Sequence, residues 1–196
     1  MFVMFSLLTT LGLRDAPGEQ PPPNHAALLL LANWAIAYLW MSTRIPKILL
    51  GIDNNVAPRE DLTKYGEEAV KLGKISRYTL NKLKREEAAH ANAMEGYTLF
   101  VATSMYFLPA WAIRPESIQT YFQSVLIEIA LIAVFAGVPN RDINMFGVWY
   151  TLSRIAFSLC YSYIETPALS YMRSLAWWSG NISCIHGLLM AAKRLQ

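Results

Sequence analysis

Residues 26–50 read AALLLLANWAIAYLWMSTRIPKILL, a stretch with only two charged side chains, both in its last third. About 20 mainly apolar residues in a helix are enough to cross the roughly 30 Å hydrocarbon core of a bilayer. Four more largely apolar segments follow, at residues 84–111, 121–138, 145–163 and 169–192. Because soluble domains rarely need so many long apolar segments, the sequence predicts an all-α integral membrane protein of four to five hydrophobic helices.

Composition and charge also favour a membrane protein, and they argue against a nucleic-acid partner. Of the 196 residues, 54% are hydrophobic, and the formal net charge is only +3. Ten of the 17 lysine and arginine residues lie between Arg44 and Arg85, interspersed with acids. Basic residues concentrate in the cytoplasmic loops of membrane proteins. We therefore expect residues 51–85 to form a cytosolic loop, residues 1–25 an N-terminal apolar segment with a proline-rich turn, and residues 26–196 one transmembrane domain.

The two basic residues of the first segment lie on either side of Pro46. Long basic side chains near a helix end can extend to the lipid headgroups, and this explains Lys47. Arg44 lies deeper in the segment, so it is a candidate for a binding role.

A polar cluster opens the second segment and contains Arg85, His90, Asn92 and Glu95. Polar groups in an apolar helix are costly unless they meet partners or a wet cavity. At about 100° per residue, Asn92 and Glu95 share one helix face, whereas His90 stands about 160° from Asn92 and is expected to meet a neighbouring helix or subunit. The alternative is that this helix end protrudes into water, so that all four side chains are solvated.

A second polar set lies on the later apolar segments and contains Arg154, Tyr161 and Arg173. Arg154 and Tyr161 are about two helical turns apart, so they share a face. A carboxylate and an amide on one helix, facing guanidinium and phenol groups on another, would bind a zwitterionic ligand with several charges. Cys160 and Cys184 show no metal-ligand spacing, and no metal is expected.

These residues give the chain a resemblance to the membrane-associated proteins in eicosanoid and glutathione metabolism, the MAPEG family, which includes the microsomal glutathione transferases. The resemblance covers most of the chain from Ala26 onward. Its most specific part is the string AHANAME at residues 89–95. The other residues that carry it are, in chain order, Asp53, Asn54, Pro58, Arg59, Arg154, Tyr161, Pro167, Arg173, Trp177 and Gly180.

The resemblance implies a four-helix transmembrane bundle that forms a trimer, with glutathione bound between subunits. The binding site would face the cytosol from the endoplasmic reticulum or another endomembrane. The resemblance also implies that Asn92 and Glu95 bind the polar ends of the tripeptide, assisted by Arg44 and Tyr161. His90, in the same motif, is included among the candidate cofactor-binding residues.

The same resemblance implies the catalytic residues. Arg173 resembles the arginine that stabilises the glutathione thiolate and lowers the pKa of the thiol, so that the nucleophile is present near neutral pH. Tyr161 is the second candidate for this role. Arg154 joins the candidate cofactor-binding residues, because it is expected to brace the site through an ion pair with Glu95.

The sequence departs from the family pattern in two places. Ala88 and Ala91 stand where members with known glutathione sites carry arginines beside the histidine, so part of the cationic contact to the glutathione carboxylates is missing. Segment 121–138 lengthens the chain between the two polar sets by about one helix. If this segment spanned the membrane, it would move Tyr161 away from Asn92. We therefore expect an extra hydrophobic helix that dips into the membrane or packs beside the bundle.

Three functions remain open at this point. The first is a membrane-bound, glutathione-dependent transferase or isomerase that acts on a lipophilic small molecule. The second keeps the fold but acts without glutathione, as an isomerase or cyclase in which Glu95, His90 or Tyr161 donates a proton. The third is a non-enzymatic member that binds lipid or a partner membrane protein.

Overall fold

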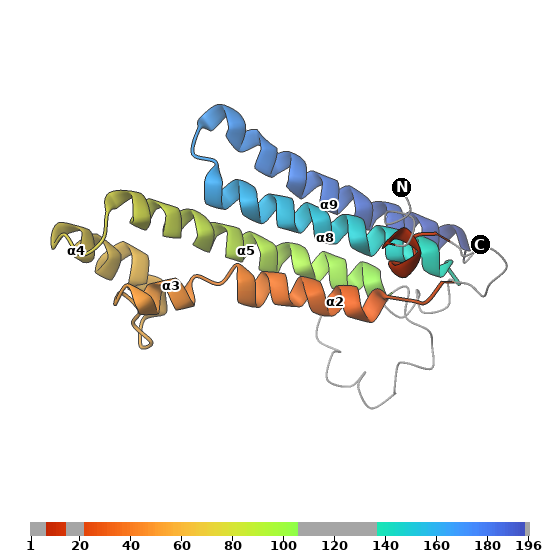
Figure 1. The fold of residues 1–196 in the computed structure, drawn as a ribbon, viewed down its shortest axis with the longest axis horizontal. Helices are drawn as coiled ribbons and strands as arrows, with labels where there is room; N and C mark the ends of the chain where they lie inside the picture. Colours follow the sequence, from red (N-terminus) through yellow and green to blue (C-terminus); the bar gives the residue numbers. More distant parts are fainter. Residues whose placement is uncertain (1–6, 15–21, 106–136, 195–196) are drawn as a thin grey trace.

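The computed structural model describes residues 7–14, 22–105 and 137–194. Within these ranges the chain forms helices, turns and irregular links and no strand, which confirms the all-α prediction for them. The long helices run side by side in an elongated bundle (Figure 1). They are α2 (Ala26–Ala35), continued by the π-helix η1 (Ile36–Trp40), then α5 (Arg77–Met105), α8 (Asn140–Tyr163) and α9 (Pro167–Arg194).

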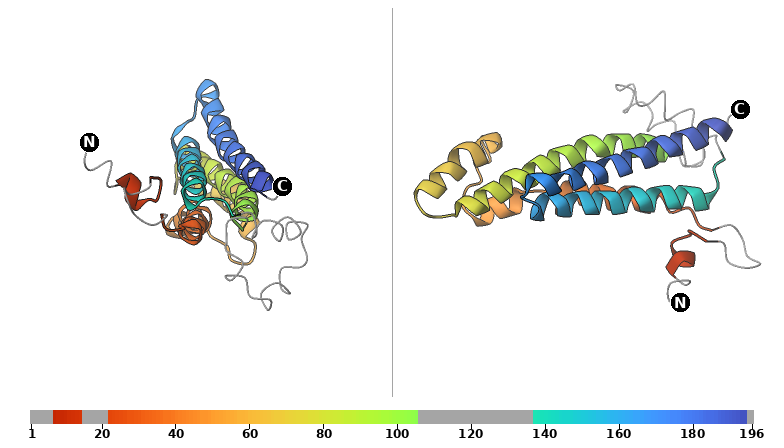
Figure 2. Two further views of the ribbon diagram at one scale, coloured as in Figure 1. Left: turned by 90° about the vertical axis from the view of Figure 1, so that its right-hand side faces the viewer. Right: turned by 90° about the horizontal axis from the view of Figure 1, so that it is seen from above.

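Helices α5 and α8 form the centre of the bundle, since they pack against each other and each also packs against α2 and α9. Figure 2 shows the arrangement from two further directions. One apolar core lies around the first half of α8 and contains Ala26, Ile143, Phe146, Tyr150 and Cys184. A second lies around its second half and contains Ala37, Met41, Ala89, Ala93 and Phe157. The bundle is thus held by apolar contacts along its whole length.

The first helix is not continuous, although the sequence predicts one helix over residues 26–50. Helix α2 passes into η1, the chain leaves helical geometry at residues 41–43, and the short helix α3 (Arg44–Leu49) follows. Pro46 gives the physical reason. Proline has no N–H to bond the carbonyl four residues earlier, and its ring clashes with that carbonyl.

One stretch of the described residues, Ala26–Leu49, is long and apolar enough to cross a membrane by length and composition. It lies near the N-terminus. Helices α5, α8 and α9 have the necessary length, 24 to 29 residues, but no second stretch in the described ranges passes the same test of composition. Residues 121–136, which make up most of the extra hydrophobic helix expected at 121–138, lie outside the described residues.

Residues 51–76 form a small helical lobe at one end of the bundle (Figure 1). The apolar core of the lobe includes Leu62 and the α5 residues Leu80 and Leu83, so the lobe packs on the start of α5. Its helical elements are η2 (Pro58–Glu60), η3 (Asp61–Tyr65) and α4 (Gly66–Lys71).

Helix α5 begins at Arg77, earlier than the start near Lys84 that the apolar pattern predicts. Ser76 caps the helix, since its hydroxyl oxygen accepts the Thr79 N–H at 3.0 Å. The charged residues of the first turns then find partners on the lobe. Lys84 and Arg77 bond the Glu67 carboxylate at 2.7 and 2.6 Å, and these bonds lower the pKa of Glu67.

A buried ion pair joins α3 to the lobe. The Lys47 ammonium lies 3.0 Å from the Asp61 carboxylate, and the two side chains are 7% and 0% exposed. The contact is ionic, because its angles do not make a hydrogen bond. The other Asp61 oxygen accepts the Asn54 N–H at 2.9 Å. The expectation that Lys47 extends to lipid headgroups is therefore wrong, since a carboxylate holds its ammonium inside the protein.

The opposite end of the bundle is closed by Asn144, which is fully buried on α8. Its amide nitrogen donates to the carbonyls of Gly12 and Pro23, at 3.2 and 2.9 Å. Its oxygen accepts the His25 N–H at 2.9 Å. These bonds tie the described part of the N-terminal segment to the bundle.

Candidate functional site

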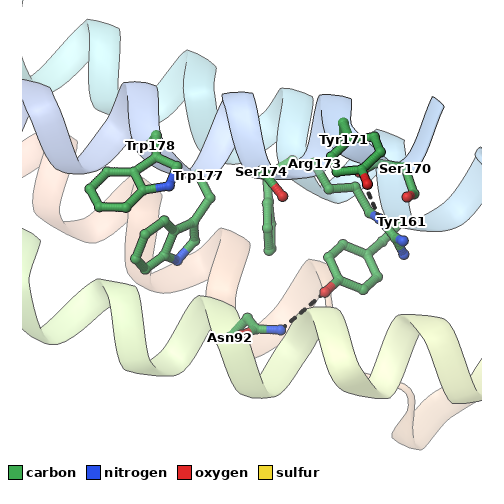
Figure 3. A pocket seen from close by; sticks show the side chains of 9 residues that line it. Asn92, Tyr161, Ser170, Tyr171, Arg173, Ser174, Trp177 and Trp178 are labelled. Carbon is green, nitrogen blue, oxygen red and sulfur yellow. Dashed lines mark hydrogen bonds between the residues drawn. The ribbon is translucent and has the colours of Figure 1, made fainter. Parts of the chain in front are cut away.

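A cavity of about 390 Å³ lies between α5 and the facing sides of α8 and α9. We call it the site cavity. It lies where α9 diverges from the other helices toward its own N-terminal end (Figure 1). Its volume is within the range of small-molecule pockets, about 300–1,000 Å³. The residues that line it are Asn92, Phe157, Tyr161, Ser170, Tyr171, Arg173, Ser174, Trp177 and Trp178 (Figure 3).

Tyr161 connects the polar groups of the site cavity (Figure 3). The Asn92 amide nitrogen donates to the Tyr161 hydroxyl oxygen at 3.2 Å. The Arg173 guanidinium lies over the Tyr161 ring, 4.6 Å from its centroid, in a cation–π contact. The structure thus brings together three of the predicted site residues from three different helices.

Two groups in the cavity are available to a ligand. Because the Tyr161 oxygen accepts from Asn92, its own hydroxyl proton can be donated elsewhere. The Arg173 Nε donates to the Ser170 carbonyl at 3.3 Å, which leaves the two terminal guanidinium nitrogens for a ligand. The lining contains no carboxylate, so the positive charge of Arg173 is uncompensated there, and it lies among hydroxyl groups that include that of Tyr161. This combination suits an anion.

The cavity has a polar end and an aromatic end. Figure 3 shows Arg173 and Tyr161 at one end and Trp177 and Trp178 at the other. The two indole rings pack edge to face, with centroids 5.0 Å apart and an interplanar angle of 87°. An aromatic wall beside a few polar groups suits a ligand that is part lipophilic and part charged.

Ser170 and Ser174 also line the cavity, and neither was predicted as a site residue. A signal for both was present, because residues three and four apart share a helix face. Ser170, Arg173, Ser174 and Trp177 follow this spacing along α9. A helical wheel centred on Arg173 would have found both serines.

Two predicted cofactor-binding residues, Glu95 and Arg44, are exposed and do not line the site cavity. Glu95 is exposed on α5, on the same face as Asn92 and one turn away, as the helical spacing predicts. Arg44 is exposed beside the lobe, where its guanidinium donates to the Asn55 side chain at 2.8 Å. Within one chain, neither residue reaches the cavity.

His90 contacts the first helix and does not line the cavity. Its Nδ1 lies 2.8 Å from the Ala37 carbonyl oxygen, which can only accept, so Nδ1 carries the proton. In η1 the Met41 N–H bonds the Ile36 carbonyl rather than that of Ala37, which therefore needs a donor from another helix. The prediction that His90 meets a neighbouring helix is confirmed.

Arg154 lies in the bundle core and does not line the cavity. It is buried, its guanidinium donates to the Trp177 carbonyl at 3.1 Å, and it lies 4.8 Å from the Tyr150 ring centroid. Its Nε and Nη1 atoms have no hydrogen-bond partner among the described residues. The expected ion pair with Glu95 is not formed, because Glu95 faces outward while the guanidinium is enclosed.

Two glycines make room for Arg154. A Cβ atom added to Gly180 of α9 would clash with Arg154 Nη2 and lie 2.6 Å from the Ser153 hydroxyl oxygen. A Cβ atom added to Gly96 of α5 would lie 2.9 Å from Arg154 Nη1. The guanidinium is therefore wedged between the backbones of two helices at positions where any larger residue must displace it.

We expect Gly180→Ala to lower the free energy of unfolding by about 1–3 kcal/mol, as overpacking of a filled core does. Gly96 and the Tyr150 ring enclose Arg154 on its other sides, so the guanidinium has no space to move into. The unfolding temperature of the purified protein, followed by circular dichroism, measures the effect. In an open helical position the same change would stabilise the helix by about 1 kcal/mol. A rise in the unfolding temperature would therefore contradict this close packing.

The chain was compared with protein-family models, with curated proteins and with solved structures. No protein-family model matches the chain, and no curated protein or solved structure matches it either. The function of the site must be inferred from its residues and its geometry.

Proposed function

We propose that this chain is a membrane-bound enzyme with a MAPEG-like fold that uses glutathione on a lipophilic small molecule, as a transferase or an isomerase. The observation that carries the proposal is the division of the site cavity into two ends. One end holds the uncompensated Arg173 cation and the Tyr161 hydroxyl, which suit a thiolate. The other holds Trp177 and Trp178, which suit a lipophilic electrophile.

In the proposed reaction, Arg173 lies beside the glutathione sulfur and favours the thiolate, because an opposite charge within about 4–6 Å lowers a pKa by about 1–3 units. The Tyr161 hydroxyl donates a hydrogen bond to the same sulfur, while Asn92 holds its oxygen. The thiolate attacks an electrophilic carbon of a substrate packed against the tryptophans. A carbon–sulfur bond forms, the leaving group departs with its electron pair, and the thiol proton passes to solvent.

The exposed apolar surface supports a bilayer as the proposed surroundings. Along α9, Leu175, Trp178, Ile182, Ile185 and Leu189 are 48–70% exposed. Large contiguous apolar patches are rare on soluble monomers. We propose an endomembrane location, such as the endoplasmic reticulum, with the site cavity open to the cytosol and with lipid or a neighbouring copy covering the apolar faces.

A homotrimer would complete the charge balance of the proposed site. Glutathione carries two carboxylates and one ammonium group, which is more charge than Arg173 alone can match. Glu95 and Arg44 are exposed, and a neighbouring copy could bring such residues to the ligand. This agrees with the binding between subunits that the family resemblance implies.

Glutathione binding is tested by thermal unfolding of the full chain in detergent. A ligand at 100 times its Kd stabilises the folded state by about 2.7 kcal/mol, so the unfolding temperature should rise and then level off with glutathione concentration. The rise should disappear in Arg173→Ala. It should persist in Arg141→Gln, which changes an exposed arginine at the far end of α8. If millimolar glutathione does not raise the unfolding temperature of the parent protein, the proposal is wrong.

The second candidate is an isomerase or cyclase that acts on a lipophilic metabolite without glutathione. The single arginine in the cavity lining favours it, because one cation leaves a glutathione carboxylate unmatched within one chain. Tyr161 would then donate a proton directly to the substrate. Turnover that persists after glutathione has been removed by dialysis would identify this second function.

A further inference from the structure

Arg85, near the start of α5, bonds the end of α8 and the corner that follows it. Its Nη2 atom lies 2.6 Å from the Glu165 carboxylate, and its Nε donates to the Tyr161 carbonyl at 3.3 Å. Glu165 belongs to the corner between α8 and α9, residues 164–166. One side chain of α5 therefore reaches both the backbone of a site residue and the link to α9.

Tyr161 is held at both ends by one face of α5. Arg85 bonds its carbonyl oxygen, and Asn92 bonds its hydroxyl oxygen. Arg85 and Asn92 are two helical turns apart, so they project from the same side of the helix. Because α8 ends at Tyr163, the Tyr161 carbonyl is one of the last carbonyls of that helix, which lack a donor within it. Arg85 supplies that donor from α5.

The same ion pair links α9 to α5. Residues 167–169 and 171–172, in the first turns of α9, are exposed, so packing alone holds them weakly. Arg173 follows them directly and lies over the Tyr161 ring. The Arg85–Glu165 pair fixes the corner from which these turns start. The spacing between Arg173 and Tyr161 therefore depends on a contact outside the cavity.

We infer that Arg85 and Glu165 are positioning residues for the site cavity. Arg85 holds Tyr161 directly, and the Arg85–Glu165 pair holds Arg173 through the corner. The expected effect of this pair on the reaction rate rests on the proposed function. Its expected effect on the distance between α9 and α5 does not. Breaking the pair frees the corner, and the N-terminal half of α9 moves farther from α5. A misplacement of about 1 Å can cost on the order of 10²-fold in rate.

The structural consequence is tested by the distance between spin labels on α5 and α9. Asn81 and Leu169 are exposed and are suitable positions for the labels. The labels require a background in which Cys160→Ser and Cys184→Ala remove the native thiols. Pulsed electron–electron double resonance in detergent or nanodiscs should give one narrow distance distribution for this labelled protein.

Arg85→Gln and Glu165→Gln should each broaden that distribution and move it to longer distance. The exchanged variant Arg85→Glu/Glu165→Arg restores the attraction and should narrow the distribution again. Arg77→Gln is the matched control, because it removes an ion pair of the same 2.6 Å length on the lobe side of α5. It should leave the distribution unchanged. Unchanged distances in both single variants overturn the inference.

Kinetics then separate the two proposals. Neither Arg85 nor Glu165 lines the cavity, so each single variant should lower kcat by about tenfold or more, with little change in the KM for glutathione. A fall in kcat without a change in the distances overturns the positioning role. If the single variants broaden the distance distribution but the parent protein does not bind glutathione, the positioning role is supported and the proposed function is rejected.

Discussion

Arg173→Ala is expected to lower kcat/KM for the glutathione-dependent reaction by about 10²–10³-fold, the loss found when one electrostatic donor to an anion is removed from an active site. Arg173 is the one cation of the cavity lining. Its Nε bonds the Ser170 carbonyl, so the rest of the guanidinium can face a ligand. Without this charge, a thiol of ordinary pKa is only about a few per cent ionised at pH 7.

The pH dependence of the rate separates a role in ionisation from a role in folding. In the proposed reaction the Arg173 cation lowers the thiol pKa, so the rate of the parent protein should reach its plateau at a lower pH. In Arg173→Ala the thiol pKa returns toward its free value, and the rate should continue to rise at higher pH. A folding defect would lower the rate at every pH without moving the profile.

Two further variants sharpen this test. Arg173→Lys keeps the charge but loses the planar guanidinium fork, so an intermediate rate is expected. Arg141→Gln, remote from the cavity, should react like the parent. The measurement is the initial rate of thioether formation between glutathione and an aryl halide, with protein amounts matched. Equal rates and equal pH profiles in the parent and Arg173→Ala would contradict the assignment.

Helices α8 and α9 could be predicted from the sequence because apolar residues recur along each of them. Apolar patterning predicts α8 at residues 145–163, and the structure has Asn140–Tyr163. It predicts α9 at 169–192, and the structure has Pro167–Arg194. The added residues at the helix starts are mostly polar or proline, which suit a first helical turn but do not belong to an apolar pattern.

The candidate site could be predicted only in part. Helical spacing correctly put Asn92 and Glu95 on one face of α5, but it could not show where on that face α9 leaves a cavity. Arg154 and Tyr161 also share a face of α8, yet their surroundings differ. Near Gly180, α9 approaches closely enough to enclose Arg154, whereas toward its N-terminal end it diverges and leaves Tyr161 facing the cavity. The path of a neighbouring helix is set by tertiary packing, so the spacing of residues within one helix cannot predict it.

The position of Lys47 also depends on tertiary packing and could not be predicted from the sequence. In the sequence it ends an apolar segment, where extension to the headgroups is the usual outcome. In the structure the helix is interrupted at residues 41–43, and Lys47 faces Asp61 of the lobe. No local pattern connects the two residues, because the pair exists only after the lobe has folded back on α3. A pair formed in this way is buried, so its loss should be costly.

Lys47→Met is expected to lower the free energy of unfolding by about 3–5 kcal/mol, the cost of leaving a buried charge uncompensated. The Asp61 side chain is 0% exposed, so water cannot replace the ammonium. The Asn54 N–H still donates to the carboxylate but does not neutralise it. At roughly 2–4 °C per kcal/mol for a chain of this size, the unfolding temperature should fall by about 10 °C. Circular dichroism of the purified protein in detergent measures this change.

The double variant Lys47→Met/Asp61→Asn separates the buried charge from the loss of packing. Asparagine keeps an oxygen for the Asn54 N–H, and neither partner of the buried pair is then charged. The Glu87 carboxylate, 3.8 Å from the Lys47 ammonium, stays charged but is 40% exposed and can be solvated. Most of the stability should therefore return. Lys64→Met is the matched control, because it removes an ion pair with Glu60 whose side chains are 64% and 50% exposed. Such a pair contributes about 1 kcal/mol or less. If the two single lysine variants unfold at the same temperature, or if the double variant is no more stable than Lys47→Met, then the pair is not what fastens the lobe to α3.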